Sequence, residues 1–542
     1  MKKNLFLASI ISLFFQPSIS QADYFKVIEK TTNSTSKIIS IETVQSQIKY
    51  TTPEVVQNLP YFLAESNTDS KLNQSFLKET LKSELNIKEN LFLKNLAQTK
   101  NLESKELKSV EVRSFVTDGP INNRIHLTIL GDGYTESEKE KFFADAKRIT
   151  DNLFTESTFD SYLPLFQVHA VFVASNESGL GDGSPKDTAF ELYRTPKGSK
   201  RAIYPGNQSA LERALTYAPK TDYPIIIAND DFYGGLGGRY AISTRSVKSG
   251  MIVLRHELGH NFGNVGEEYD GGQVYSGANS SSDARAEKWS HWRNDQSTYT
   301  SKLIGGYYLW QNLKNNPYKT TFQTEPNETV GLELSTVGWS SPDDVTLTVN
   351  GQRIDLGGTY HNDRNFYIID GLNVNEKTNT LEVKENIQDQ DNVLATAYVY
   401  TYPKDYNFNE SILASFSTYS ESGRKTFRPT HNSCIMRNMM VKHFCAVDQE
   451  NMWHQFLKRM TLIDGLTQTA DAVQLSTPNL SGLTISWFNE NNIELTFLRN
   501  NKTISKKSID GRAKKLKVVV ELKTAEVRKY DQKFKTEKTI SL

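Results

Sequence analysis

The sequence has few cysteines, no excess of either charge and no long apolar segment after its first residues. Lys plus Arg and Asp plus Glu number 63 each among 542 residues, so no overall field favours nucleic acid or an anionic membrane. No later stretch approaches the ~18 apolar residues that a membrane-spanning helix needs. The composition therefore argues against a nucleic-acid partner and a transmembrane segment, and is typical of a folded globular protein.

The only two cysteines are Cys434 and Cys445. In an exported protein, a pair this close in sequence can close a disulfide loop, which would stabilise the fold by roughly 3 kcal/mol. We expect this disulfide, and two buried unpaired thiols are the alternative.

The first 22 residues have the order of a secretory signal peptide. Lys2 and Lys3 make the start basic, and residues 5–15 are apolar apart from small Ser and Ala. Pro17 and the small residues before Ala22 suit a cleavage site. The apolar run is too short to span a membrane. We therefore expect a secreted or periplasmic protein; a buried first strand or helix is the alternative.

Composition and pattern divide the rest of the chain into segments. Residues 23–117 are rich in Ser, Thr, Asn and Lys and are expected to form an accessory or prosegment-like region. Residues 118–330 and 403–478 are predicted to form two parts of one α/β domain. Residues 331–402 are predicted to be an inserted antiparallel β-module and residues 479–542 a C-terminal β-module, because apolar and polar residues alternate between turns.

The first part of the α/β domain alternates between strand and helix patterns. Residues 125–130, 166–173 and 223–228 predict strands, the last of them a continuous apolar run suited to a covered sheet. Thr135 and Glu138 have the spacing of a capping box at the start of a helix. Strands separated by helices indicate a layered α/β fold.

A motif with metal-binding spacing follows the third strand, at residues 256–260. On a helix, His256 and His260 lie one turn apart on the same face, so both imidazoles can reach one ion. The carboxylate of Glu257 can then accept a proton from metal-bound water. Two imidazoles and a carboxylate suit zinc and leave one position open for water. Two surface histidines on an amphipathic helix are the alternative for this motif alone.

A third ligand is available just after this helix. Gly263 lets the chain turn sharply and return towards the metal. Glu267 and Glu268 follow within a few residues, and either can supply a carboxylate. The extended motif therefore predicts a site with three protein ligands.

Residues 256–269 resemble the signature of the M64 peptidases, also called igalysins or IgA-peptidase-like metzincins. Residues 129–135, 229–238 and 432–438 are similar to three other stretches of this family. The resemblance covers about residues 120–465, apart from the inserted β-module. It implies a metzincin-like, α/β (α+β) zinc peptidase catalytic domain, with the zinc helix in its first part and the Met-turn in its second.

The resemblance also implies the zinc ligands. His256 and His260 would bind one catalytic Zn²⁺. Gly266 occupies the place of the usual third metzincin ligand, so the carboxylate must come one or two residues later. We favour Glu267, where the family commonly has Asp, and Glu268 is the close alternative.

Other roles follow from the same resemblance. Glu257 would act as general base and then as acid towards the leaving amine. Met436 would lie beneath the metal as a hydrophobic floor. In metzincins an edge strand before the active-site helix pairs with extended substrate, and Ala241, Ile242 and Ser243 are the candidates here.

Two other polar segments carry weaker signals. Asp182 and Asp187 lie near several glycines and could bind Ca²⁺, but the spacing of an EF-hand is absent, so an ordinary polar turn is favoured. The glycines of residues 234–238 resemble a phosphate-binding loop, yet the Lys-Ser/Thr of a P-loop is absent. A flexible turn is expected there.

Together these features predict a secreted zinc metalloendopeptidase that hydrolyses peptide bonds of proteins or peptides. The β-modules could contact a cell surface, glycans or protein partners, so they leave specificity open. One alternative is a non-catalytic surface or glycan-binding protein with structural zinc, which would need four protein ligands. Another is a different zinc hydrolase, such as an amidase or deacetylase.

Overall fold

The computed structural model describes residues 107–542, apart from 156–157, 195–200, 286, 306–307, 315, 375 and 388–390, and three strands near the N-terminus. The chain divides into two compact units, Met1–Glu106 and Leu107–Leu542. Within the described part, no helix is both long and apolar enough to cross a membrane.

The first unit contains a three-stranded antiparallel sheet of β1 (Ser9–Phe15), β2 (Asp23–Thr32) and β3 (Thr35–Val44). β1 coincides with the apolar run of the predicted signal peptide, and the signal peptide stays a prediction. The rest of the predicted accessory region, up to Glu106, lies outside the described residues.

A six-stranded sheet forms the centre of the second unit, in the order β11-β12-β10-β5-β6-β4. Strands β5, β6, β10 and β12 run parallel, and β4 and β11 are antiparallel to their neighbours. The strands are β4 (Val110–Val116), β5 (Ile125–Asp132), β6 (Phe166–Val173), β10 (Tyr223–Ala228), β11 (Gly235–Leu236) and β12 (Ala241–Thr244). Because β4 joins this sheet, the domain begins before the predicted residue 118.

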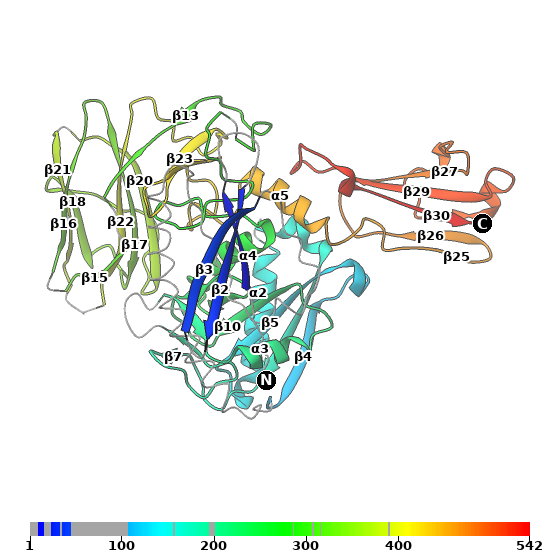
Figure 1. Ribbon diagram of the computed structural model, residues 1–542, viewed down its shortest axis with the longest axis horizontal. Helices are drawn as coiled ribbons and strands as arrows, with labels where there is room; N and C mark the ends of the chain where they lie inside the picture. The colour runs from blue at the N-terminus through cyan, green and yellow to red at the C-terminus, as the bar shows by residue number, and fades with distance from the viewer. Residues whose placement is uncertain are drawn as a thin grey trace. The chain divides into compact units, whose positions relative to one another are not determined.

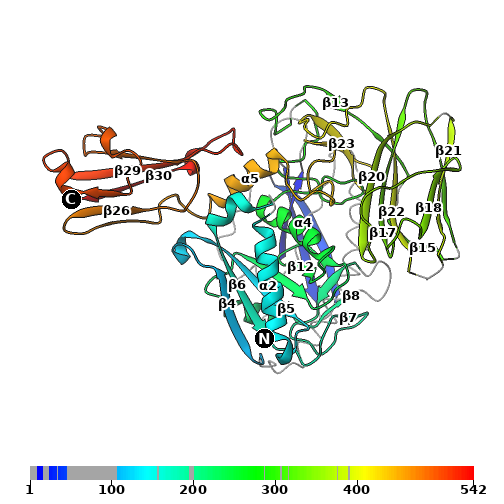
Figure 2. The same ribbon diagram turned by 180° about the vertical axis from the view of Figure 1, so that it is seen from behind.

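Helices cover both faces of the central sheet. Leu127 and Ile129 of β5 share one apolar core with Leu254, on the side of the helices α2 and α4 that lie side by side in Figure 2. The next residue, Leu130, packs with Leu211 in a second core on the side of α3. The helices are α2 (Lys139–Leu153), α3 (Gln208–Leu215), α4 (Gly250–Gly263) and α5 (Ala446–Phe456). The predicted α/β class is therefore confirmed.

Two layers of antiparallel strands form the inserted β-module (Figure 1). One layer contains β14 (Lys302–Gly305), β15 (Tyr308–Asn312), β17 (Thr329–Val337), β20 (Arg364–Leu372) and β22 (Val393–Tyr402). The other contains β16 (Tyr318–Gln323), β18 (Val345–Val349), β19 (Gln352–Arg353) and β21 (Thr378–Glu385). The module begins near residue 302, earlier than the predicted 331, because β14 to β16 pair with strands far along the chain.

Six further strands at the C-terminus form two three-stranded sheets. They are β25 (Gly465–Gln468), β26 (Ala472–Ser476), β27 (Leu483–Phe488), β28 (Thr503–Ser505), β29 (Lys515–Leu522) and β30 (Lys535–Ser541). This module begins at β25, before the predicted residue 479. A buried ion pair, in which Arg124 Nη2 donates to Asp464 Oδ2 at 2.8 Å, joins its first strand to the start of β5.

Two small sheets complete the described fold. One contains β7 (Gly181–Asp182), β8 (Leu192–Arg194) and β9 (Ile203–Pro205). The other contains β13 (Thr298–Tyr299), β23 (Ser415–Tyr419) and β24 (Lys425–Arg428).

Candidate metal centre

The predicted metal-binding helix is α4, and it lies largely buried against the central sheet. Leu254, Leu258 and Phe262 point into the core, so the opposite face carries the polar side chains. The helix ends at Asn264, which has a φ of 50° and donates its N–H to His260 O at 2.8 Å. The sharp turn that was expected at Gly263 therefore occurs one residue later, at an asparagine that tolerates the left-handed conformation.

This turn brings a carboxylate back to the two histidines of α4. Glu267 Oε2 lies 3.1 Å from His256 Nε2, and Glu267 Oε1 lies 3.2 Å from His260 Nε2. The three side chains place one ligand atom each within 4.8 Å of the others. The structure thus brings together His256, His260 and Glu267, as the sequence predicts.

The hydrogen bonds of both Nδ1 atoms determine the tautomer of the two imidazole rings. His256 Nδ1 lies 3.2 Å from Ile435 O, and His260 Nδ1 lies 2.8 Å from Val265 O. A carbonyl oxygen can only accept, so each Nδ1 carries the proton in these contacts. In a neutral ring, each Nε2 then directs a lone pair at the centre, which is the form that binds a metal.

The charge at this centre also suits a cation. Burial lowers the pKa of His260, but the neighbouring carboxylate of Glu267 more than offsets this and raises it to about 10. Burial raises the pKa of Glu267, yet the two imidazoles hold it well below its ordinary value. Glu267 Oε2 is buried and has no hydrogen-bond donor within the described residues. Two imidazole lone pairs and this oxygen fit a divalent transition metal such as zinc.

Glu268 points away from this centre, although it is adjacent in sequence. Its side chain is completely buried, and Oε1 accepts a hydrogen bond from Asn279 Nδ2 at 3.0 Å. Its carboxylate belongs to a second cluster of metal-ligating side chains, together with Cys434, Cys445 and Asp448. Of the two candidates for the third ligand, only Glu267 therefore faces the histidines.

Glu257 lies half-buried on α4 between the two histidines, and its carboxylate reaches the glycine-rich loop after β10. A methyl group at Gly237 would overlap Glu257 Oε2. Because Gly237 has no side chain, the Glu257 carboxylate can occupy this space. The sequence predicts only a flexible turn here and does not reveal this role.

We expect Gly237→Ala to lower kcat for peptide cleavage by about 10²-fold, because the added methyl group displaces the Glu257 carboxylate. The metal ligands do not contact this glycine, so metal content should stay unchanged. Steady-state kinetics and metal analysis of the purified variant check this. Arg239→Ala, at an exposed position of the same loop, is the control. Wild-type kcat for Gly237→Ala would contradict this placement of Glu257.

The predicted substrate strand, β12, is not at the edge of the sheet, so the expected edge placement is wrong. Ala241 pairs with Ile225 of β10, while Ile242 and Ser243 pair with β11 on the other side. All three candidate residues are at most 2% exposed. The segment expected to be a flexible turn supplies this outer strand, since Gly235 and Leu236 extend the sheet by one strand.

Met436 lies directly against α4 at Gly259, the residue before His260. Its side chain is completely buried, and a methyl group at Gly259 would overlap both Met436 Sδ and the ring of Phe444. Met436 O also accepts a hydrogen bond from the N–H of Glu268 at 3.1 Å. The role of Met436 as an apolar floor beneath the metal stays a prediction.

The predicted disulfide is not formed, and both cysteines are buried free thiols. The carboxylate of Asp448 accepts from both. Cys434 Sγ donates to Asp448 Oδ2 at 3.2 Å, and Cys445 Sγ donates to the same oxygen at 3.8 Å. The sequence separation of the cysteines gave no sign of this acceptor.

Asp182 and Asp187, considered for calcium, belong to neither group of three or more metal-ligating side chains found in the described residues. Asp182 lies in the short strand β7, and Asp187 Oδ2 accepts from Asn176 Nδ2 at 2.7 Å. This arrangement is that of a polar turn.

Sequence reasoning missed a residue of the inserted module that holds the start of α4. Asp363 Oδ2 accepts from the hydroxyls of Ser246 and Ser249, each at 2.6 Å. Asp363 Oδ1 accepts from the N–H of Tyr233, at the start of the glycine-rich loop, at 2.8 Å. One carboxylate therefore fixes both segments that flank the centre.

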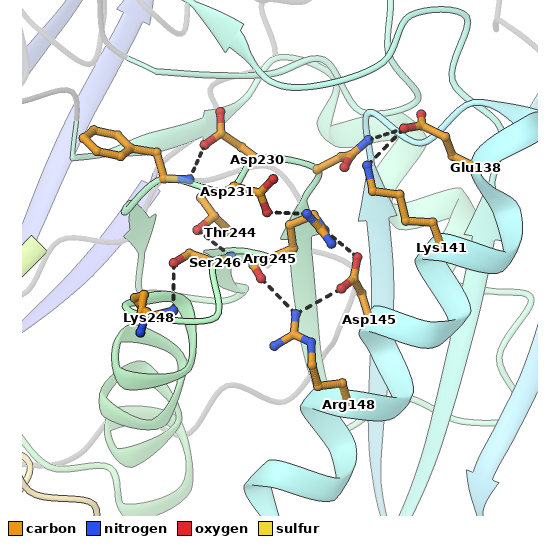
Figure 3. Close-up of polar contacts among 12 residues, drawn as sticks. Glu138, Lys141, Asp145, Arg148, Asp230, Asp231, Thr244, Arg245, Ser246 and Lys248 are labelled. Carbon is orange, nitrogen blue, oxygen red and sulfur yellow. Dashed lines mark hydrogen bonds and ion pairs between the residues drawn. The ribbon is translucent and has the colours of Figure 1, made fainter. Parts of the chain in front are cut away.

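Residues of α2 also hold the loop before α4 (Figure 3). Arg245 Nε donates to Asp145 Oδ2 at 2.7 Å, and its guanidinium also pairs with Asp231. Arg148 Nη2 donates to Arg245 O at 2.8 Å. Ion pairs and hydrogen bonds thus position the first turn of the metal-binding helix.

We expect Asp363→Ala to lower the free energy of unfolding by about 3 kcal/mol or more, because it leaves several buried donors without an acceptor. We also expect lower peptide cleavage, since the start of α4 loses its anchor. Denaturant unfolding and kinetics test both effects. Asp343→Ala, an exposed aspartate in the same module, should behave like the wild type. Equal stability of the two variants would contradict the anchoring role.

A second connection reaches the turn that carries Glu267. Arg437 follows Met436, is buried, and pairs with Glu333 of β17 at 2.9 Å and with Asp270 at 3.4 Å. Tyr400 of β22 donates its hydroxyl to Asp270 Oδ2 at 2.8 Å. The inserted module is therefore bonded to the metal-ligand turn as well as to the start of α4.

A known family matches the part of the chain that contains the three converging side chains. Residues 114–321, which include all three converging side chains and Glu257, match the family model described as IgA Peptidase M64. The M64 peptidase family predicted from the sequence is thus confirmed for residues 114–321. No curated protein matches the chain.

Similarity to solved structures is low. The chain is 13% identical to dimeric latent PorU from Porphyromonas gingivalis, covering 26% of this chain and 18% of that chain, with a TM-score of 0.17. It is 10% identical to a β-glucuronidase from Ruminococcus gnavus (42% and 36% covered, TM-score 0.10) and 9% identical to one from Lactobacillus rhamnosus (46% and 46% covered, TM-score 0.11). The chain spans less than half of each, and these matches support no functional conclusion.

Proposed function

We propose that the protein is an exported zinc metalloendopeptidase that hydrolyses peptide bonds of proteins or peptides. The observation that carries this proposal is the convergence of His256 Nε2, His260 Nε2 and the Glu267 carboxylate on one point. Glu257 lies beside that point without belonging to the convergent group. Three ligands and a separate carboxylate are what a hydrolytic zinc centre needs.

His256, His260 and Glu267 would hold the ion. Zinc, when bound there, polarises the scissile carbonyl and lowers the pKa of a water molecule so that it can attack at neutral pH. The contacts of both Nδ1 atoms with carbonyl oxygens keep the rings oriented for this task.

Glu257 would move the protons of the reaction. Its carboxylate accepts a proton from the attacking water and then donates it to the nitrogen of the leaving amine. Its carboxylate lies against Gly237, on the same helix as the two metal-binding histidines.

The number of converging ligands argues against a purely structural zinc at this point. A closed structural site needs four protein ligands, and three converge here among the described residues. The side chains of His260 and Glu267 also remain 22% and 16% exposed, so solvent reaches the centre. The proposal of export rests on the N-terminal sequence, and contacts of the β-modules with a cell surface or glycans remain a proposal from their strand pattern.

Removal and return of the metal test this function. We expect the purified mature protein to cleave a peptide library, to lose at least about 10²-fold of this activity after treatment with a chelator, and to regain it with Zn²⁺. The library digest, read by mass spectrometry, also gives the sequence preference. Cleavage that survives chelation would contradict the metal mechanism. Hydrolysis of acylated sugars without peptide cleavage would instead support a deacetylase or amidase.

A further inference from the structure

A second group of metal-ligating side chains includes Glu268, the residue after the metal ligand Glu267; we call it the inner cluster. It comprises Glu268, Cys434, Cys445 and Asp448, all of them buried. They come from three segments: the turn after α4, the loop that carries Met436, and the N-terminus of α5. Each offers one ligand atom, and these four atoms lie within 4.8 Å of one another.

Two separations within this cluster are close to those around a tetrahedral zinc ion. Zn–S bonds of about 2.3 Å and Zn–O bonds of about 2.0 Å place neighbouring ligand atoms about 3.3–3.8 Å apart. Cys434 Sγ and Cys445 Sγ lie 3.2 Å and 3.8 Å from Asp448 Oδ2. Small side-chain movements would therefore bring four ligands around one ion.

Two carboxylate oxygens of the cluster lack the partners that buried oxygens need. Glu268 Oε2 and Asp448 Oδ1 are buried and accept no hydrogen bond from any part of the chain that the structure describes. Leaving such atoms unpaired is costly in a protein interior. A cation among the four side chains would balance the charge of both carboxylates and both thiolates at once.

The surroundings supply part of the charge balance that four anionic ligands require. The guanidinium of Arg428 is buried nearby and donates from Nη1 to Thr418 Oγ1 at 2.9 Å, and that hydroxyl donates to Glu268 O. Asn279 Nδ2 holds Glu268 Oε1. The cluster therefore has a neighbouring cation and an oriented ligand.

We propose that Glu268, Cys434, Cys445 and Asp448 bind a second metal ion, a structural zinc with four protein ligands. Four ligands leave no open position, so this ion has no catalytic role. It would tie the turn after α4 to the loop of Met436, because the adjacent residues Glu267 and Glu268 would each bind a different ion. We call the group of His256, His260 and Glu267 the outer centre. The assignment of the inner cluster is independent of whether the outer centre hydrolyses peptides.

Cobalt substitution of the full mature chain tests the inner site. Cysteine thiolates bound to Co²⁺ give a sulfur-to-metal charge-transfer absorption, and the outer centre, with only His and Glu, cannot produce it. We expect this absorption in the wild type and in a His256→Ala/His260→Ala variant, and its loss in Cys434→Ser/Cys445→Ser. Zinc content should fall from about two ions per chain to about one in each double variant.

Thiol counting keeps the test decisive if the cysteine variant fails to fold. In the unmodified protein, both thiols should react after denaturation with a chelator and resist reaction in the native zinc form. No reactive thiol after denaturation would reveal a disulfide and overturn the proposal. Two thiols that react freely in the native zinc-loaded protein, or cobalt binding without charge-transfer absorption, would also overturn it. A catalytically inactive wild type that keeps the absorption would contradict only the peptidase proposal.

Discussion

Replacing Glu257 by glutamine is expected to lower kcat for peptide cleavage by about 10²–10⁴-fold while zinc stays bound at the outer centre. The amide has the shape of the carboxylate but cannot take a proton from the attacking water. His256, His260 and Glu267 keep their mutual contacts, because Glu257 takes part in none of them. Kinetics on a peptide from the library digest, together with zinc analysis, measure the two effects separately.

The matched control for this substitution is Glu382→Gln, which makes the same chemical change at a half-buried position of β21, where the carboxylate pairs only with Lys319 at 3.6 Å among the described residues. It should retain wild-type kcat and zinc content. Near-wild-type cleavage by Glu257→Gln would remove the general-base assignment. Loss of zinc from Glu257→Gln would show instead that this carboxylate is a ligand.

The three residues of the outer centre could be predicted from the sequence, because they lie close together along the chain. His256 and His260 are four residues apart on a helix, so their convergence needs no knowledge of the rest of the fold. The return of Glu267 after the helix end is also local. The strands β5, β6 and β10 were predictable for a similar reason, since each is a distinct apolar segment.

Contacts between distant segments could not be predicted in this way. Asp363 lies 114 residues from Ser249, and no pattern near either residue indicates the hydrogen bond between them. The disulfide prediction considered only the two cysteines, whereas the position of Asp448 decides what their sulfurs contact. The edge placement of the substrate strand is wrong for the same physical reason, because the pairing of Gly235 with Ser243 decides which strand is outermost.

Replacing Glu267 by glutamine is expected to raise the zinc concentration for half-maximal activity by more than about 100-fold. Loss of a partner that only orients a ligand already costs 10–100-fold in metal affinity, and here a negatively charged ligand itself is neutralised. The two imidazoles remain, so saturating zinc should restore part of the cleavage. Activity measured over a series of buffered zinc concentrations checks this shift.

A glutamate near the same turn provides the control. Glu421 is exposed, and its N–H donates to Gly272 O, so Glu421→Gln alters surface charge close to the centre without touching a ligand. It should keep the wild-type zinc dependence, which separates loss of a ligand from loss of local negative charge. An unchanged zinc dependence in Glu267→Gln would mean that the carboxylate facing both histidines contributes nothing to binding. Because Glu268 faces the inner cluster, no neighbouring glutamate could take over that position without rebuilding the turn after α4.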